Sequence, residues 1–97
     1  MTPHLSILQQ NILALCLEHK FMSCNELLLE LWDLQPQEQG SKKYASAHSS
    51  LSRTLTKLWM KNLIIYWKTI NRSKTGITLT RPGQRLIESI LEKAEDA

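Results

Sequence analysis

Hydroxyl and cationic side chains recur at helical spacing near the middle of the sequence. They follow one another at steps of three, four, three and four residues, with Ser49 alongside: Lys43, Ser46, Ser50, Arg53 and Lys57. Residues at these steps share one face of an α-helix. Hydroxyl and ammonium groups bind phosphate oxygens, and arginine also binds the edge of guanine. Because the serines are small, such a helix could approach a large, rigid polyanion closely.

The charges of the chain are distributed unevenly. The net charge is only +3, but residues 39–87 contain ten basic side chains and no acidic one. Residues 1–38 carry a charge of −4 and residues 88–97 a charge of −3. A basic block of this kind favours a polyanionic partner. The alternative is a basic, solvated surface that has no partner.

Size and residue content exclude several classes of protein. A chain of 97 residues, 42% of them hydrophobic, is expected to fold as one domain, 1–97, around one core. It contains no nucleophile–base pair, paired carboxylates or phosphate-binding glycine loop, so we do not expect an enzyme. Cys16, His19 and Cys24 fall short of the four ligands of a structural zinc site. No metal or cofactor is therefore predicted.

The amino-terminal segment has neither a basic leader nor a long apolar run. Gln9, Gln10 and Asn11 interrupt its apolar residues, which argues against a secretory signal and a membrane span. We expect a cytoplasmic, nucleoid-associated protein with no membrane partner. Two cysteines are too few for a disulfide scaffold and are expected to be buried thiols.

Periodicity and capping residues predict the elements that would position the basic face. We expect four helices and two strands: helices over about 3–19, from Ser23 to the loop at Pro36, from Ser41 to about Lys61 and from Thr80 into the acidic tail, with strands over 64–70 and 77–80. Residues 71–76 form the predicted turn between the strands. The predicted fold class is mainly α with a small β-hairpin.

The first predicted helix has a wide apolar arc. Such an arc indicates burial against a second subunit, although a helix held on two sides by its own domain would have the same pattern. The expected dimer interface joins this helix to the last one through Leu5, Leu8, Ile12, Ile90 and Leu91.

The aromatic residues have two possible roles. Large aromatic side chains most often fill a core, and a ligand pocket or a base-stacking platform is the alternative. We expect core positions for Trp32, Trp59, Tyr66 and Trp67.

Two motifs resemble winged helix-turn-helix regulators. Ser50-Leu51-Ser52-Arg53-Thr54-Leu55, then Leu58 and Asn62-Leu63-Ile64, resembles the recognition helix and wing entry of MarR-like and PadR-like repressors, with Asn62 in place of the usual glycine. Leu79-Thr80-Arg81-Pro82-Gly83-Gln84-Arg85-Leu86 is similar to the L-T-x-x-G-x-x-L that closes their wing. The resemblance covers nearly the whole chain and implies three helices, a two-stranded wing and a closing helix.

The resemblance also implies a function. A sequence-specific regulator of transcription, most often a repressor, would place its third helix in the major groove of double-stranded DNA and act as a homodimer. Groove contacts would come from Ser46, Ser49, Ser50 and Arg53, phosphate contacts from Lys42, Lys43, Lys57 and Lys74, and a minor-groove contact from Arg72. The alternative is a winged-helix module that binds protein or RNA.

Overall fold

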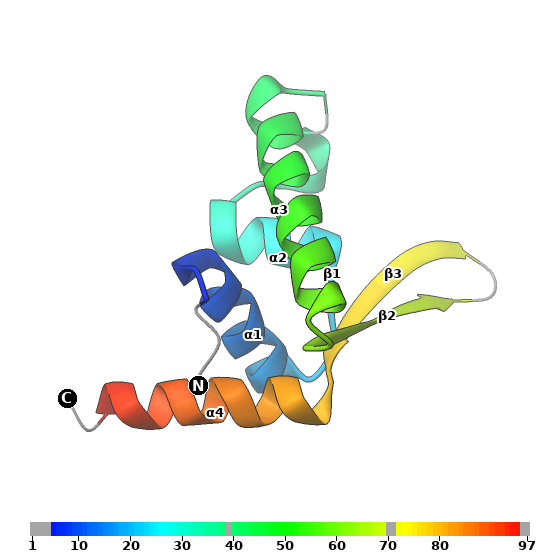
Figure 1. Ribbon diagram of the computed structural model, residues 1–97. Helices are drawn as coiled ribbons and strands as arrows, with labels where there is room; N and C mark the ends of the chain where they lie inside the picture. Colours follow the sequence, from blue (N-terminus) through cyan, green and yellow to red (C-terminus); the bar gives the residue numbers. More distant parts are fainter. Residues whose placement is uncertain (1–4, 39, 70–71, 96–97) are drawn as a thin grey trace.

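The fold combines a helical body with an extended hairpin. The computed structural model describes residues 5–38, 40–69 and 72–95. Its elements, in chain order, are α1 (Ile7–His19), β1 (Met22–Ser23), α2 (Cys24–Trp32), the 3-10 helix η1 (Pro36–Glu38), α3 (Lys42–Met60), β2 (Ile64–Thr69), β3 (Arg72–Leu79) and α4 (Arg81–Glu95). The β2–β3 hairpin projects sideways from the lower end of α3, and α4 runs beneath α1 (Figure 1). The predicted mainly helical fold with a small β-hairpin is confirmed.

The sheet differs from the prediction in two respects. Its strand order is β1-β3-β2, and both pairings are antiparallel. The short strand β1, which pairs Met22 with Ile77, was not predicted because two residues carry no periodicity. Strand β3 begins at Arg72, so most of the predicted turn over 71–76 is strand, held by pairing with β2. Residues 70 and 71 lie outside the described part of the chain.

A single core joins every helix to the sheet. The predicted inner face of α3 is confirmed, since its buried residues are Tyr44, Ala47, Leu51, Leu55 and Leu58. These side chains pack with buried residues of the other elements: Ile12, Leu13, Leu27, Leu28, Ile64, Ile77 and Ile87. The opposite face of α3 is thereby directed away from the core.

Three predicted helix caps are confirmed. The Ser23 hydroxyl accepts a hydrogen bond from the Glu26 backbone amide at 3.2 Å, and the Glu26 carboxylate accepts one from the Ser23 amide at 3.4 Å. The Ser41 hydroxyl accepts from the Tyr44 amide at 3.1 Å. The Thr80 hydroxyl accepts from the Gly83 amide at 3.0 Å. These bonds fix where α2, α3 and α4 begin.

The first helix begins later than predicted. Its cap is Ser6, whose hydroxyl accepts from the Gln9 amide at 3.1 Å while the Gln9 side chain accepts from the Ser6 amide at 3.0 Å. This capping box starts α1 at Ile7. The predicted start at Pro3 lies outside the described residues.

Helix α1 is held on two sides by its own chain. It packs against α4, and also against α3 and the sheet. Leu5 and Ile12 are 5% and 0% exposed, so these two predicted interface residues are core residues instead. The wide apolar arc thus follows from packing within one chain.

The aromatic prediction is wrong for Trp59. This side chain is 56% exposed, whereas Trp32 and Tyr66 are half-buried against the core. The rings of Trp59 and Tyr66 lie 6.4 Å apart between centroids and are tilted by 53°. Trp59 therefore covers the junction of α3 with the hairpin without being enclosed by it. The side chain of Trp67 lies outside the described part.

The base of the hairpin is locked to α4. The Thr80 backbone amide donates to the Leu63 carbonyl at 3.1 Å, and the Thr80 hydroxyl donates to the Asn62 carbonyl at 2.6 Å. Asn62 has φ of 60°, which asparagine adopts more readily than most residues. A Cβ atom at Gly83 would collide with the Leu63 carbonyl, so glycine is required there. These contacts set the direction of the hairpin relative to α3.

Candidate nucleic-acid interface

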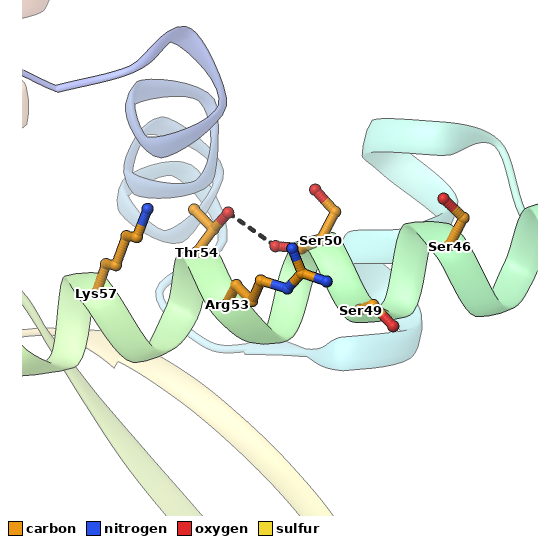
Figure 2. Close-up of a pocket in the computed structure, with 6 residues that line it drawn as sticks. All are labelled: Ser46, Ser49, Ser50, Arg53, Thr54 and Lys57. Carbon is orange, nitrogen blue, oxygen red and sulfur yellow. Dashed lines mark hydrogen bonds between the residues drawn. The ribbon is translucent and has the colours of Figure 1, made fainter.

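The outer face of α3 presents a groove whose described lining comes from α3. The groove has a volume of about 490 Å³ and is lined by Ser46, Ser49, Ser50, Arg53, Thr54 and Lys57. Figure 2 shows Ser46, Ser50, Thr54 and Lys57 projecting to the same side of the helix, with the Arg53 guanidinium directed along it toward Ser49 and Ser50. Five of these six residues were predicted, and the structure brings them together.

Hydrogen bonding within α3 separates two kinds of hydroxyl group. Thr54 donates to the Ser50 carbonyl at 2.8 Å, and Thr56 donates to the Ser52 carbonyl at 2.9 Å. Within the described part of the chain, the hydroxyls of Ser46, Ser49 and Ser50 have no hydrogen-bond partner. The serines can therefore bond to a ligand, whereas the threonine hydroxyls are already engaged.

Thr54 was not predicted as a lining residue. It lies four residues after Ser50, and a threonine at this position in a helix commonly bonds to the carbonyl one turn earlier. This spacing is visible in the sequence, but it predicts an internal bond and not a ligand contact. Thr54 can therefore contribute its methyl group, and not its hydroxyl, to the wall of the groove.

The cations of this face have no carboxylate partner in the part of the chain that the structure describes. Lys42, Lys43, Arg53 and Lys57 are exposed, and α3 contains no acidic residue. Over residues 5–38, 40–69 and 72–95, none of these four forms an ion pair. Their positive potential is therefore not neutralised within the described chain, and an external anion can satisfy it.

Lys42 and Lys43 occupy an unfavourable place for helix stability. They form the first turn of α3, where the helix dipole is positive and an acidic side chain is favoured. Cations there oppose the dipole by about 0.3–1 kcal/mol each. Helix stability thus gives no reason for two lysines at this end, whereas binding of an anionic ligand does.

The predicted wing residues lie on the hairpin arm. Arg72 and Lys74 belong to β3, in the part of the hairpin that extends away from the helical body (Figure 1). Their side chains are outside the described part. The hairpin that carries them leaves the helical body at the lower end of α3 (Figure 1).

The remaining predicted interface residues differ in exposure. Leu8 and Ile90 are half-buried against the core, whereas Leu91 is 40% exposed. A hollow of about 300 Å³ near Leu91 is lined by Leu17, Glu88, Leu91 and Glu92. Only Leu91 of the five predicted residues presents a largely free apolar side chain.

The two thiols are poorly suited to chemistry at neutral pH. Burial raises the pKa of Cys16 from 9.0 to about 11, and burial also raises the pKa of Cys24. A thiol must ionise to act as a nucleophile or a metal ligand. In the described part, no three His, Cys, Asp or Glu side chains are grouped closely enough to hold a metal ion.

Comparison with known proteins identifies the fold. A MepR mutant from a multidrug-resistant S. aureus clinical isolate matches with a TM-score of 0.69 and 19% identity, over 88% of this chain and 54% of that one. A mutant of Lactococcus lactis ZitR matches with a TM-score of 0.70 and 18% identity, over 97% of this chain and 56% of that one. The chain thus spans about half the length of these structures.

The similarity lies in the structure and not in the sequence. No family model matches the chain, and no curated protein matches its sequence. The chain has the winged-helix fold of MarR-like transcriptional regulators, as its two motifs predicted.

None of the helices over 5–38, 40–69 and 72–95 is long and apolar enough to cross a membrane.

Proposed function

We propose that residues 1–97 act as one winged-helix domain that binds double-stranded DNA sequence-specifically and regulates transcription. The observation that carries the proposal is the outer face of α3, where serines and cations that have no partner among the described residues line one groove. MepR and ZitR, which share the fold, are MarR-family DNA-binding regulators. In this fold the helix equivalent to α3 has the shape that fits a major groove.

The dimensions of α3 support this placement. Its 19 residues span about 28 Å at 1.5 Å per residue, and a major groove about 12 Å wide admits one α-helix. Small serines allow the backbone to approach the bases, and Arg53 is the side chain suited to reading guanine. Lys42, Lys43 and Lys57 would bind phosphates, with Lys74 and Arg72 of the hairpin on the backbone or in the minor groove.

Assembly and regulation complete the proposal. One such module contacts only a few base pairs, so we infer a homodimer that reads two half-sites about 34 Å apart. Binding over a promoter would make it a repressor in the cytoplasm, associated with the nucleoid and without enzymatic activity. This part of the proposal rests on the fold shared with MepR and ZitR.

The alternative is a winged-helix module that binds a protein or RNA. The observation in its favour is the pair of exposed apolar side chains at the end of α3, Trp59 and Met60. Binding through an apolar surface depends little on salt, whereas binding to phosphates releases counterions and weakens as salt rises. Salt dependence therefore discriminates a protein partner from a nucleic-acid partner.

Selection from a randomised duplex pool tests the proposal directly. The expected result is an enriched palindromic site, with affinity that falls steeply between about 50 and 200 mM salt. Arg53→Ala is expected to lose the preference for the enriched site over random duplex. Enrichment of no sequence, or affinity independent of salt, would remove DNA recognition as the function.

A further inference from the structure

One apolar side chain lies on the proposed DNA-binding face. Met60 is 74% exposed at the last residue of α3. It lies seven residues after Arg53 and eleven after Ser49, so all three share a face of the helix. Lys57 and Lys61 flank it and are exposed. Met60 is therefore an apolar group within a surface that otherwise carries cations and hydroxyls.

Packing within the chain does not account for this position. The buried residues of the last two turns of α3, Leu55 and Leu58, lie on the opposite side of the helix. The hollow around Leu91 belongs to α1 and α4. Met60 thus contributes to neither the core nor the surface where we place the dimer interface.

The turns of α3 that precede Met60 also carry a mostly apolar surface. A hollow of about 370 Å³, lined by Ser52, Arg53, Thr56 and Lys57, lies on the preceding turns and has mostly apolar walls. Thr56 contributes to them with its hydroxyl already bonded to the Ser52 carbonyl. The outer face of α3 therefore changes along its length, from hydroxyl-rich at Ser46–Ser50 to apolar at Met60.

The major groove of DNA contains one apolar group that matches this change. Thymine presents its C5-methyl group there, which is neither a hydrogen-bond donor nor an acceptor and which no other standard base carries. A methionine side chain is flexible and adapts its shape to an apolar neighbour. Seven residues of helix rise by about 10.5 Å, which corresponds to about three base pairs.

We propose that Met60 contacts a thymine methyl group in the major groove, about three base pairs from the base pair that Arg53 reads. This inference rests on the proposed DNA-binding function and assigns a second specificity residue to the same face. It makes the preferred half-site bipartite, with a guanine opposite Arg53 and a thymine opposite Met60.

Replacement of thymine by uracil removes only the methyl group and provides the test. Each thymine of the duplex selected by the wild-type protein is replaced in turn, and affinity is measured for the wild type and for Met60→Ala. At one position the wild type is expected to lose affinity about fourfold, the effect of exposing one methyl group. Met60→Ala is expected to bind the thymine and uracil duplexes equally, while Met60→Leu restores the difference.

Two controls separate the possible failures. Leu29→Ala removes a partly exposed apolar side chain from α2 and is expected to keep the full thymine preference. The same loss on thymine replacement in Met60→Ala as in the wild type would overturn the role of Met60 and leave DNA binding intact. Failure to select any duplex would overturn the proposed function and this inference together.

Discussion

Neighbouring side chains on one helix face differ in whether they can bind a ligand. Thr54 and Ser50 lie one turn apart, yet the Thr54 hydroxyl donates to the Ser50 carbonyl while the Ser50 hydroxyl has no partner among the described residues. Arg53 and Lys57 are free of carboxylates in the same part of the chain. We therefore expect the contribution of each residue to DNA binding to follow its free donors and not its position alone.

Arg53 and Lys57 are expected to respond differently to truncation. Arg53→Ala should weaken binding to the selected duplex by about 1–3 kcal/mol and relax preference at one base pair. Lys57→Ala should weaken binding to selected and random duplexes alike. It should also reduce the slope of log affinity against log salt concentration by about one, the effect of losing one phosphate contact. Fluorescence anisotropy with both duplexes at several salt concentrations measures this. Equal losses on both duplexes for Arg53→Ala would show that Arg53 binds only phosphate.

The buried thiol of Cys16 is expected to destabilise the fold at alkaline pH. The thiol ionises near pH 9 in the unfolded chain, whereas burial raises its pKa to about 11 in the folded chain. The stability that depends on the protonated thiol is fully present below pH 9 and is lost as pH rises through 11. The loss should reach about 2–3 kcal/mol. Urea unfolding of the wild type and Cys16→Ala at pH 8 and pH 11 measures it, and an equal decline in both would contradict the prediction.

Backbone contacts between elements determine how the hairpin is presented. Thr80 joins the end of β3, the start of α4 and the loop after α3 by bonding to the carbonyls of Asn62 and Leu63. Gly83 allows the Leu63 carbonyl to lie against the first turn of α4. The L-T-x-x-G pattern therefore has a structural reason: it fixes the hairpin relative to α3, so that both can meet one ligand.

Gly83→Ala tests this junction because helix propensity and the clash with the Leu63 carbonyl would change the free energy of unfolding in opposite directions. Helix propensity alone would make alanine more stable by about 1 kcal/mol. The added Cβ would collide with the Leu63 carbonyl, so we expect a net loss of about 1–3 kcal/mol in the free energy of unfolding. Chemical denaturation measures the change, with Gln84→Ala at the neighbouring exposed position as the control. A variant as stable as the wild type would show that the junction adapts.

The charges of the whole molecule are distributed unevenly among its elements. The basic block of residues 39–87 includes α3 and the hairpin. Acidic residues belong to α1, to α2 and the segment that follows it, and to α4. In Figure 1, α4 lies across the base of the molecule, and the hairpin extends from the lower end of α3. This distribution would orient the proposed DNA-binding domain in the field of a polyanion, and the proposed homodimer would form through α1 and α4.

Association is expected to depend on the exposed part of the α1–α4 surface. Leu5 and Ile12 are buried, so Leu91, which lies beside Leu17, is the one of the five residues expected at the interface that is largely exposed. Leu91→Glu should therefore shift the protein from dimer to monomer at micromolar concentration, whereas Leu29→Glu on α2 should not. Light scattering across a concentration series measures this. A wild-type protein that is monomeric throughout would contradict the proposed dimer.

Local chemistry explains which features were predictable. The caps Ser23, Ser41 and Thr80 are confirmed because each bonds to a backbone amide three residues ahead. The buried stripe of α3 is confirmed because its period depends on helix geometry alone. The same geometry placed five of the six groove residues on one face.

Backbone pairing and tertiary packing decided the rest. Strand β1 exists because it pairs with a distant segment of β3, and a two-residue strand carries no pattern of its own. The early start of β3 comes from hairpin pairing of Arg72 with Thr69 and of Thr75 with Lys68, which residue types alone do not encode. Burial of Ile12 and exposure of Trp59 and Met60 depend on which elements pack beside them. The sequence alone determined the four α-helices, the caps of three of them and the chemistry of the α3 face. The tertiary structure decided which apolar residues remain exposed, because burial is a property of several segments brought together.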